Sequence, residues 1–363
     1  GLGAYAGNYT TGTSNAYIGY LAGGYATSTD HNVAVGREAL RGQGSSTNVT
    51  GNANIAIGSY ALDAVTDNEQ NIAIGYNAAT ALNSGENYNI AIGTSALATE
   101  NSGADGCIAI GHKALEDQNT ASGGNTAIGY NAAKELTSGS DNTFLGYNVA
   151  SSGTVTGHYN VAVGKRAGYD LNAGGYNILI GAYAGQNVTD NNSNVAIGYA
   201  ALNRANSGEN YNVAIGEFAL AGLDQSAGDS CVAVGFECLK QLNVANPKNT
   251  AVGMNAGMSS METDNTFVGF KAGRFVAHGN DNTVVGSEAF ESGTYQNVTC
   301  DVNSNTTVTC DSNTDIKVGQ TVTGTHINDG TYVTAVNDPS AVTSFTLNQA
   351  AASTASNVTL NFA

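Results

Sequence analysis

Short alternations of apolar and small residues recur along most of the chain, and each one ends in a glycine. They read Asn-Val-Ala-Val-Gly at 32–36, Asn-Ile-Ala-Ile-Gly at 71–75, Asn-Val-Ala-Ile-Gly at 212–216 and Asn-Thr-Phe-Val-Gly at 265–269. Alternation with a period of two and β-branched residues is typical of a β-strand. Stretches rich in Ser, Asn, Gly and Asp come next, so each copy is predicted to be a short strand and then turns.

The glycine that closes each alternation is the anchor of a tandem repeat. Seventeen anchors lie between Gly3 and Gly286, and sixteen intervals over 283 residues give a mean period of 17.7 residues. Counted from the anchor, position −4 is Asn in fourteen of the sixteen complete copies and Cys in two, Cys107 and Cys231. Position −1 is always Ile, Val or Leu, position −2 is mostly Ala, and position +3 is Ala in fourteen copies.

Stacking of the copies explains how such short strands can fold. A single five-residue strand cannot bury a face, whereas copies stacked in register bury a continuous core. The repeat therefore predicts an all-β fold in which residues 1–292 form a long parallel β-solenoid, or β-roll, of about seventeen short coils. We expect the Ile/Val position −1 to form an apolar ladder inside, and the anchor glycine to mark a crowded or positive-φ corner. With ~4.8 Å per stacked strand, the rod is about 80 Å long.

The Asn at position −4 predicts a side-chain ladder, in which each carboxamide bonds to the coils above and below it. A general preference of Asn for turns is the alternative, but it accounts for the residue type and not for the fixed offset. The residues expected in this ladder are Asn32, Asn54, Asn71, Asn89, Asn125, Asn142, Asn160, Asn177, Asn194, Asn212, Asn249, Asn265 and Asn282.

The composition agrees with this fold and narrows the partners. Gly accounts for 47 of 363 residues and charged residues for 11%, which argues against a helical bundle, while 41% hydrophobic residues argue against disorder. The net charge of −17 and the lack of a Lys/Arg cluster make nucleic acid an unsuitable partner. No apolar run approaches the ~18 residues of a membrane-spanning helix, so no membrane insertion is expected.

The repeat core Asn-x-Ala-Ile-Gly-x-x-Ala, as at 125–132 and 249–256, resembles the head repeats of trimeric autotransporter adhesins. It is more similar to the tandem Asn-Thr-Ala-Val-Gly-Tyr-x-Ala repeats in tail fibres and other virion proteins of tailed bacteriophages. The resemblance covers residues 1 to about 290. It implies a homotrimer of β-rolls about a common axis, located on the virion as a tail appendage. The partners it implies are other tail or baseplate proteins and a glycan or protein of the host cell surface.

A second region, residues 293–363, carries fifteen Thr in 71 residues and short alternating runs between Gly/Asn/Asp turns. We predict a small antiparallel β-domain here. The stretch 318–325 and the runs after it are similar to a small β module common in phage structural proteins. Cys300 and Cys310 end two matching segments on either side of a turn at 303–305, so a hairpin would place them opposite each other for a disulfide.

One aromatic position stands out as a candidate for receptor contact. It directly follows the anchor, where it interchanges with Lys165 and Glu217, so the rings are expected to be partly exposed. Exposed Tyr rings stack on sugars and suit interfaces, although each ring could instead cover the corner of a neighbouring coil or chain. These aromatic residues are Tyr20, Tyr76, Tyr130, Tyr147, Tyr199, Phe236 and Phe270.

The patterns for catalysis are weaker. The hexapeptide at 74–79 matches left-handed β-helix acyltransferases, but those enzymes carry three hexapeptides per coil, and the histidines here stand at unrelated offsets. A glycan-cleaving spike needs paired carboxylates, whereas Glu38 and Glu237 lie in a position that also accepts Lys271, as on a solvated face. Asp/Asn-rich turns match no Ca²⁺-binding motif.

We therefore expect no enzyme activity, no metal and no cofactor. The sequence predicts a structural and adhesive fibre protein of a bacteriophage virion, a tail fibre or similar appendage that takes part in host-surface attachment. A bacterial surface adhesin of the trimeric autotransporter type is the alternative. A solenoid tailspike that degrades glycan is the less favoured rival from a different functional class.

Overall fold

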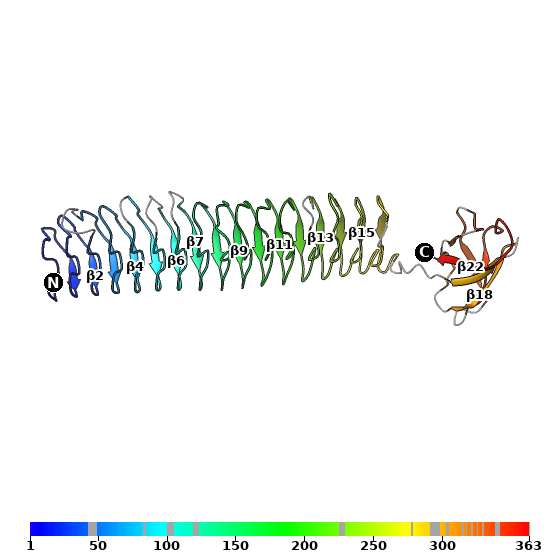
Figure 1. The fold of residues 1–363 in the computed structure, drawn as a ribbon, viewed down its shortest axis with the longest axis horizontal. Coiled ribbons are helices and arrows are strands. Elements are labelled where there is room, and N and C mark those ends of the chain that lie inside the picture. The colour runs from blue at the N-terminus through cyan, green and yellow to red at the C-terminus, as the bar shows by residue number, and fades with distance from the viewer. Residues whose placement is uncertain are drawn as a thin grey trace.

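The computed structural model describes residues 1–42, 49–82, 85–99, 105–118, 123–224, 229–276, 279–290, 298–302, 305–313, 316, 318–320, 322–324, 326–328, 330–337 and 342–362. Within these ranges every regular element is a β-strand, and the strands form two sheets (Figure 1). Across the same ranges, no helix has the length and hydropathy needed to cross a membrane.

The first sheet holds sixteen parallel strands in chain order, one for each coil of a rod (Figure 1). Each strand spans positions −3 to −1 and pairs in register with the same positions of the next coil, so that Ile55 lies opposite Ile72 and Ile57 opposite Ile74. The strands are β1 (Ala16–Ile18), β2 (Val33–Val35), β3 (Ile55–Ile57), β4 (Ile72–Ile74), β5 (Ile90–Ile92), β6 (Ile108–Ile110), β7 (Thr126–Ile128), β8 (Thr143–Leu145), β9 (Val161–Val163), β10 (Ile178–Ile180), β11 (Val195–Ile197), β12 (Val213–Ile215), β13 (Val232–Val234), β14 (Thr250–Val252), β15 (Thr266–Val268) and β16 (Thr283–Val285).

The second sheet is antiparallel, with the strand order β19-β22-β17-β18-β21-β20. Its strands are β17 (Val298–Val302), β18 (Thr307–Asn313), β19 (Val322–Gly324), β20 (Val333–Val336), β21 (Val342–Leu347) and β22 (Ala355–Phe362). Phe345, Val308 and Leu360 lie in its small apolar core. The predicted fold class, a long parallel β-solenoid followed by a small antiparallel β-domain, is confirmed.

The expectation that the Ile/Val ladder fills the interior is wrong. Position −2, which is Ala in most coils, points inward: Ala56 is fully buried, while Ile57 beside it is 38% exposed. Positions −3 and −1 point outward along the whole sheet, because neighbouring residues of a strand face opposite sides. The coil is narrow, so Ala fits the inner side of its strand wall in coils where position +4 carries a large residue such as Leu62.

Large and small residues are matched across the core. Where position −2 is Ala, position +4 is usually Leu, as in Leu62, Leu97 and Leu202, all fully buried. Where position −2 is large, the two nearest +4 residues are small. They are Gly7 and Gly23 for Tyr17, Ala133 and Ala150 for Phe144, Gly168 and Gly185 for Leu179, and Gly257 and Gly273 for Phe267. A large residue at position −2 is therefore compensated by small residues at position +4.

The anchor glycine lies at a tight corner, as predicted. Gly164 has a φ of 130°, a region that residues with a Cβ rarely enter, and a Cβ built there would lie 2.6 Å from the carbonyl oxygen of Gly181 in the next coil. Stacked anchors approach each other too closely for any other residue, so both the conformation and the spacing require glycine.

Three further positions of each coil have positive φ, and most of them carry residues other than glycine. At position +4, Leu62, Leu97 and Leu202 have φ values of 49–50°, and positions +2 and −5 are similar. A left-handed conformation costs a non-glycine residue about 1–2 kcal/mol. Hydrogen bonds between coils offset this cost: the Leu62 amide donates to the Ala78 carbonyl at 3.0 Å, and the Tyr60 amide donates to the Arg37 carbonyl at 2.9 Å.

Candidate functional site

The Asn residues at position −4 form lines of hydrogen bonds along the rod, in which Cys107 and Cys231 replace Asn in two coils. The Asn32 Oδ1 atom accepts the backbone N–H of Asn54 at 2.7 Å, and the Asn54 Oδ1 atom accepts that of Asn71 at 3.0 Å. The Nδ2 group of Asn54 donates to the Asn68 carbonyl at 2.7 Å. Asn68 lies in the turn just before the next strand, so this bond ties one strand to the turn that leads into the next. The same pattern links Asn142, Asn160, Asn177 and Asn194.

All the Asn residues expected in the ladder lie in these lines, and all except the half-buried Asn282 in the last coil are at most 1% exposed. Cys107 and Cys231 keep the backbone half of the pattern, because their N–H groups donate to Asn89 and Asn212 at 2.8 and 2.9 Å. In most of these bonds the side-chain oxygen of one Asn accepts the backbone N–H of the Asn in the next coil. Each such Asn therefore fixes the register of two successive strands.

The aromatic residues at position +1 are half-exposed, from 37% for Phe236 to 53% for Tyr76. Several form ring stacks between coils. The Tyr130 ring lies between those of His112 and Tyr147, with centroids 5.0 and 5.4 Å apart and nearly parallel planes. Tyr199 instead meets Tyr183 and Phe218 edge to face, at 5.7 and 5.4 Å. The structure therefore places these rings both at the surface and against a neighbouring coil.

A second tyrosine column was missed in the sequence. Tyr88, Tyr159, Tyr176 and Tyr211 occupy position −5, directly before the ladder Asn, and are 51–64% exposed. Tyr159 and Tyr176 stack with their centroids 5.1 Å apart. The recurring triplet Tyr-Asn-Ile/Val was the signal that could have revealed this column.

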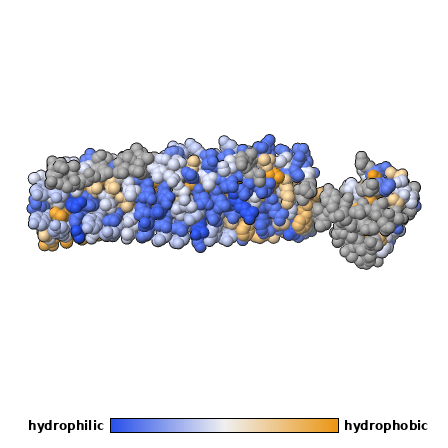
Figure 2. Space-filling view, in the orientation of Figure 1, coloured by the Kyte–Doolittle hydropathy of each residue, from blue (hydrophilic) through white to orange (hydrophobic). Residues whose placement is uncertain are grey.

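Positions −3 and −1 together form a long outer face on the sheet. Ile18, Leu145, Ile178 and Val252 on this face are 39–45% exposed, and most other members are partly buried by their neighbours alone. Sixteen three-residue strands spaced ~4.8 Å apart cover roughly 750 Å². By contrast, the long side of the rod seen in Figure 2 is mainly hydrophilic, with small hydrophobic areas that are clearest towards the C-terminal end of the solenoid.

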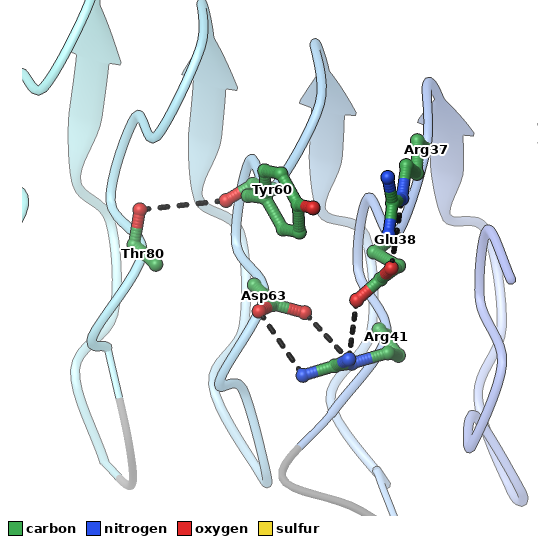
Figure 3. A network of polar contacts seen from close by, with 6 residues as sticks. All are labelled: Arg37, Glu38, Arg41, Tyr60, Asp63 and Thr80. Carbon is green, nitrogen blue, oxygen red and sulfur yellow. Dashed lines mark hydrogen bonds and ion pairs between the residues drawn. The ribbon is translucent and has the colours of Figure 1, made fainter.

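A partly buried ionic network joins two coils near the N-terminal end (Figure 3). The Arg41 guanidinium bonds to the Glu38 carboxylate and approaches Asp63 in the next coil at 2.9 Å. Arg37 also donates to Glu38, at 3.0 Å. Glu38 is only 6% exposed, so its assignment to a solvated face was wrong. Burial raises the pKa of Asp63 to about 6 even though Arg41 acts in the opposite direction.

Two carboxylates are built into the turns at equivalent places. Glu86 and Glu209, both at most 1% exposed, each accept a hydrogen bond at 2.6 Å from an Asn side chain, Asn68 and Asn191 respectively. Burial raises the pKa of Glu209. The two Asn–Glu pairs lie far from each other along the rod, and each stabilises the turns of two successive coils. Within the described ranges, no group of three or more His, Cys, Asp or Glu residues could hold a metal ion.

The structure places Cys300 directly opposite Cys310 on the antiparallel strands β17 and β18. Residues 303–304 of the predicted turn lie outside the described residues. Cys300 is 1% exposed and Cys310 is half-buried. A disulfide between them stays a prediction. Cys231 and Cys238 lie inside the solenoid, where burial raises the pKa of each thiol to about 12, so neither forms a reactive thiolate.

Searches of protein-family models, of curated proteins and of solved structures find no match to this chain. Its function is therefore inferred from its repeat and its geometry. The rod combines a buried polar ladder, an apolar outer sheet face and tyrosine columns on both sides of that face.

Proposed function

We propose that this chain is the shaft of an extended fibre, the tail fibre or a similar appendage of a tailed bacteriophage, which presents a host-binding tip. The observation that carries the proposal is the ladder-linked rod itself. Sixteen strands stacked in register give length with little cross-section, and Asn side chains bond most coils to their neighbours. The resemblance of the repeat to phage fibre repeats points to the same role.

The apolar outer face supports assembly into a homotrimer. Monomeric soluble proteins rarely expose a continuous apolar patch of more than a few hundred Å², and this face is larger and mainly apolar, with Thr at position −3 in five strands. Its area is also close to the ~800 Å² that one partner contributes to a standard interface. The face is straight and repeats at each coil, so a second and a third copy would meet it with the same repeat. The tyrosine columns would then form the rim of the interface.

Assembly can be tested by sedimentation together with substitution on the outer face. The wild-type chain should sediment as a trimer whose chains unfold together. Ile197→Asp in β11 puts a charge on the outer face and should give smaller species, whereas Glu217→Gln, an exposed position on the next coil, should leave the trimer intact. A folded wild-type monomer at micromolar concentration would contradict this part of the proposal.

The location can be tested by electron microscopy with antibodies raised against residues 1–292. Labelling of thin appendages on tailed virions would support the proposal. Labelling of a bacterial surface would support the trimeric autotransporter-type adhesin in its place, since both assemblies use stacked β-rolls.

A further inference from the structure

The turn side of the rod carries a hollow of about 620 Å³ across the coils of β11 to β14. It is formed by residues that follow the anchor by two to eight places in four successive coils. Its lining consists of Asn203, Arg204, Phe218, Ala221, Gly222, Lys240, Gln241, Asn243 and Met261. None of these residues belongs to the Asn ladder or to the tyrosine columns.

The hollow exists because one coil lacks side chains where its neighbours have them. Positions +5 and +6 are Asn203 and Arg204 in one coil and Lys240 and Gln241 two coils later, but Ala221 and Gly222 in the coil between. A Cβ added to Gly222 would collide with the backbone carbonyl oxygen of Lys240. The close stacking of the coils therefore keeps this position free of a side chain, and a notch opens between two long polar rows.

The charged side chains that line the hollow are positive, whereas the chain as a whole is negative. The protein has a net charge of −17 and only twelve Lys and Arg residues, and two of them line this hollow. Arg204 is exposed and makes no hydrogen bond or ion pair within the part of the chain that the structure describes. It therefore keeps all its donors for a ligand.

Lys240 is held in place from two sides. Its Nζ atom lies 2.6 Å from the Glu237 carboxylate and 4.8 Å from the centre of the Phe218 ring. The second oxygen of Glu237 accepts a hydrogen bond from Asn255 at 3.1 Å, so this carboxylate has its own partners. An ammonium group has three donors, and Lys240 retains donors that can reach into the hollow.

We propose that this hollow binds an acidic saccharide, with a hexuronate residue as the recognised unit. A guanidinium suits a carboxylate because it can donate two parallel hydrogen bonds. The amides of Asn203, Gln241 and Asn243 supply donors and acceptors for ring hydroxyls, and Phe218 and Met261 offer an apolar surface to a sugar face. The volume lies within the range of small-molecule sites. The strongly negative chain disfavours polyphosphates, whereas a singly charged ring with many hydroxyls matches both the cations and the amides.

The site is a lateral one on the shaft and does not depend on which fibre the shaft belongs to. Failure of the proposal would leave the proposed fibre function unaffected, and failure of the fibre function would not remove the hollow. The inference is thus tested by binding alone, on the complete chain.

Titration calorimetry with sodium D-glucuronate, D-glucose and inorganic phosphate tests the ligand class. Glucuronate should bind at least about tenfold more tightly than glucose, because only the acid satisfies Arg204. Equal affinity for glucose and glucuronate would overturn the charge recognition. Equal affinity for phosphate and glucuronate would overturn the saccharide assignment and leave a plain anion site.

Substitutions test the location. Arg204→Gln should weaken glucuronate binding about tenfold, and Lys240→Gln should weaken it by several-fold. Lys165→Gln removes an exposed cation elsewhere on the rod and should change nothing. Among the described residues Arg204 has no hydrogen-bond or ion-pair partner, so its variant should keep the wild-type circular dichroism spectrum and melting curve. Unchanged binding in folded Arg204→Gln would refute the proposal.

Discussion

The solenoid and the C-terminal sheet use β-strands in opposite ways. In the solenoid, each strand pairs with the strands one coil before and one coil after it, always with the same three positions opposite each other. In the C-terminal sheet, β17 pairs with β22 and β18 with β21, and the register shifts within several of these pairs. The effect of a substitution in the solenoid therefore depends on its repeat position, whereas in the C-terminal sheet it depends on individual partners.

The largest effect is expected at Phe267, where position −2 of the repeat carries a large residue instead of Ala. This fully buried ring fills the space left by Gly257 and Gly273, and Phe267→Ala should cost about 3–5 kcal/mol of unfolding free energy, as for other large-to-small core changes. Phe270, three residues later, is 40% exposed, and Phe270→Ala should cost far less. Denaturant unfolding of both variants measures the difference.

Compensation within the core gives a sharper version of this test. The three atoms nearest to a Cβ built at Gly273 all belong to Phe267, and Leu239 shows that Leu adopts this left-handed conformation at the same position. Gly273→Leu should therefore be harmful in the wild type but should restore part of the stability lost in Phe267→Ala. Additive losses in the double variant would show that the two positions do not share one volume.

The next effect belongs to the C-terminal sheet alone. Oxidation should join Cys300 and Cys310, which lie directly opposite each other, and the closed loop of about eleven residues should stabilise this sheet by about 2–3 kcal/mol. The solenoid transition should not move. Mass spectrometry of non-reduced peptides from protein exposed to air should find a 300–310 link, and a link from either residue to Cys107, Cys231 or Cys238 would contradict the pairing.

A single change in the Asn ladder should cost about 2 kcal/mol, less than the loss of a large core ring. Asn194→Asp removes the Nδ2 group that donates to the Glu209 carbonyl at 2.8 Å. The new carboxylate oxygen takes its place close to the Asn177 Oδ1 atom, and two acceptors there repel each other. Tyr199→Ala, at the half-exposed corner, should matter much less. If thermal unfolding ranks these two variants the other way, the ladder does not carry the stability assigned to it.

How far the sequence predicts the molecule differs between the two regions. The anchor spacing predicted the position of every coil, because stacking in register forces the same residue types to recur. It did not predict which side of the strand faces inward, since Ala and Ile are both apolar. Hydropathy favoured Ile57 inside, but the buried residue is Ala56, in a coil where position +4 is the large Leu62. The matched pairs such as Phe267 and Gly273 were visible in the sequence, yet they link different positions of the repeat and so escape a comparison made position by position.

The candidate sites show the same limit. Tyr130 and Tyr199 were predicted at the surface because their position accepts charged residues, and both are half-exposed. Glu38 was misjudged by the same reasoning, since it lies against Arg41 of its own coil, which also pairs with Asp63 in the next. The strand order of the C-terminal sheet could not be derived either, because no repeat relates β17 to β22. Non-periodic contacts of this kind leave no signal in a single sequence.

The last effect, confined to acidic solution, is the pH dependence that this ionic network gives to the solenoid. The pKa of Asp63 is raised from 3.8 in the unfolded chain to about 6 in the fold, first by burial, then by the nearby Glu38 carboxylate, and despite Arg41. The Arg41 Nη2 group donates a hydrogen bond to Asp63 Oδ2 at 3.2 Å, and Nε lies 2.9 Å from Oδ1 without the geometry of a second one, so the ion pair only partly offsets desolvation. A group whose pKa rises on folding favours the folded state below pH 3.8. That contribution declines as the pH rises towards 6 and is absent above it.

Asp63→Asn removes this titration and keeps a side chain of similar size and polarity. The difference in melting temperature, variant minus wild type, should therefore increase as the pH is raised from about 4 to about 6.5, because only the wild type loses stability as the carboxyl ionises. Asp67→Asn, in the next turn of the same coil, serves as the control and should match the wild-type profile. A difference between Asp63→Asn and the wild type that shrinks with rising pH would mean that the Arg41 ion pair outweighs desolvation, and that this network stabilises the coils as an ordinary salt bridge.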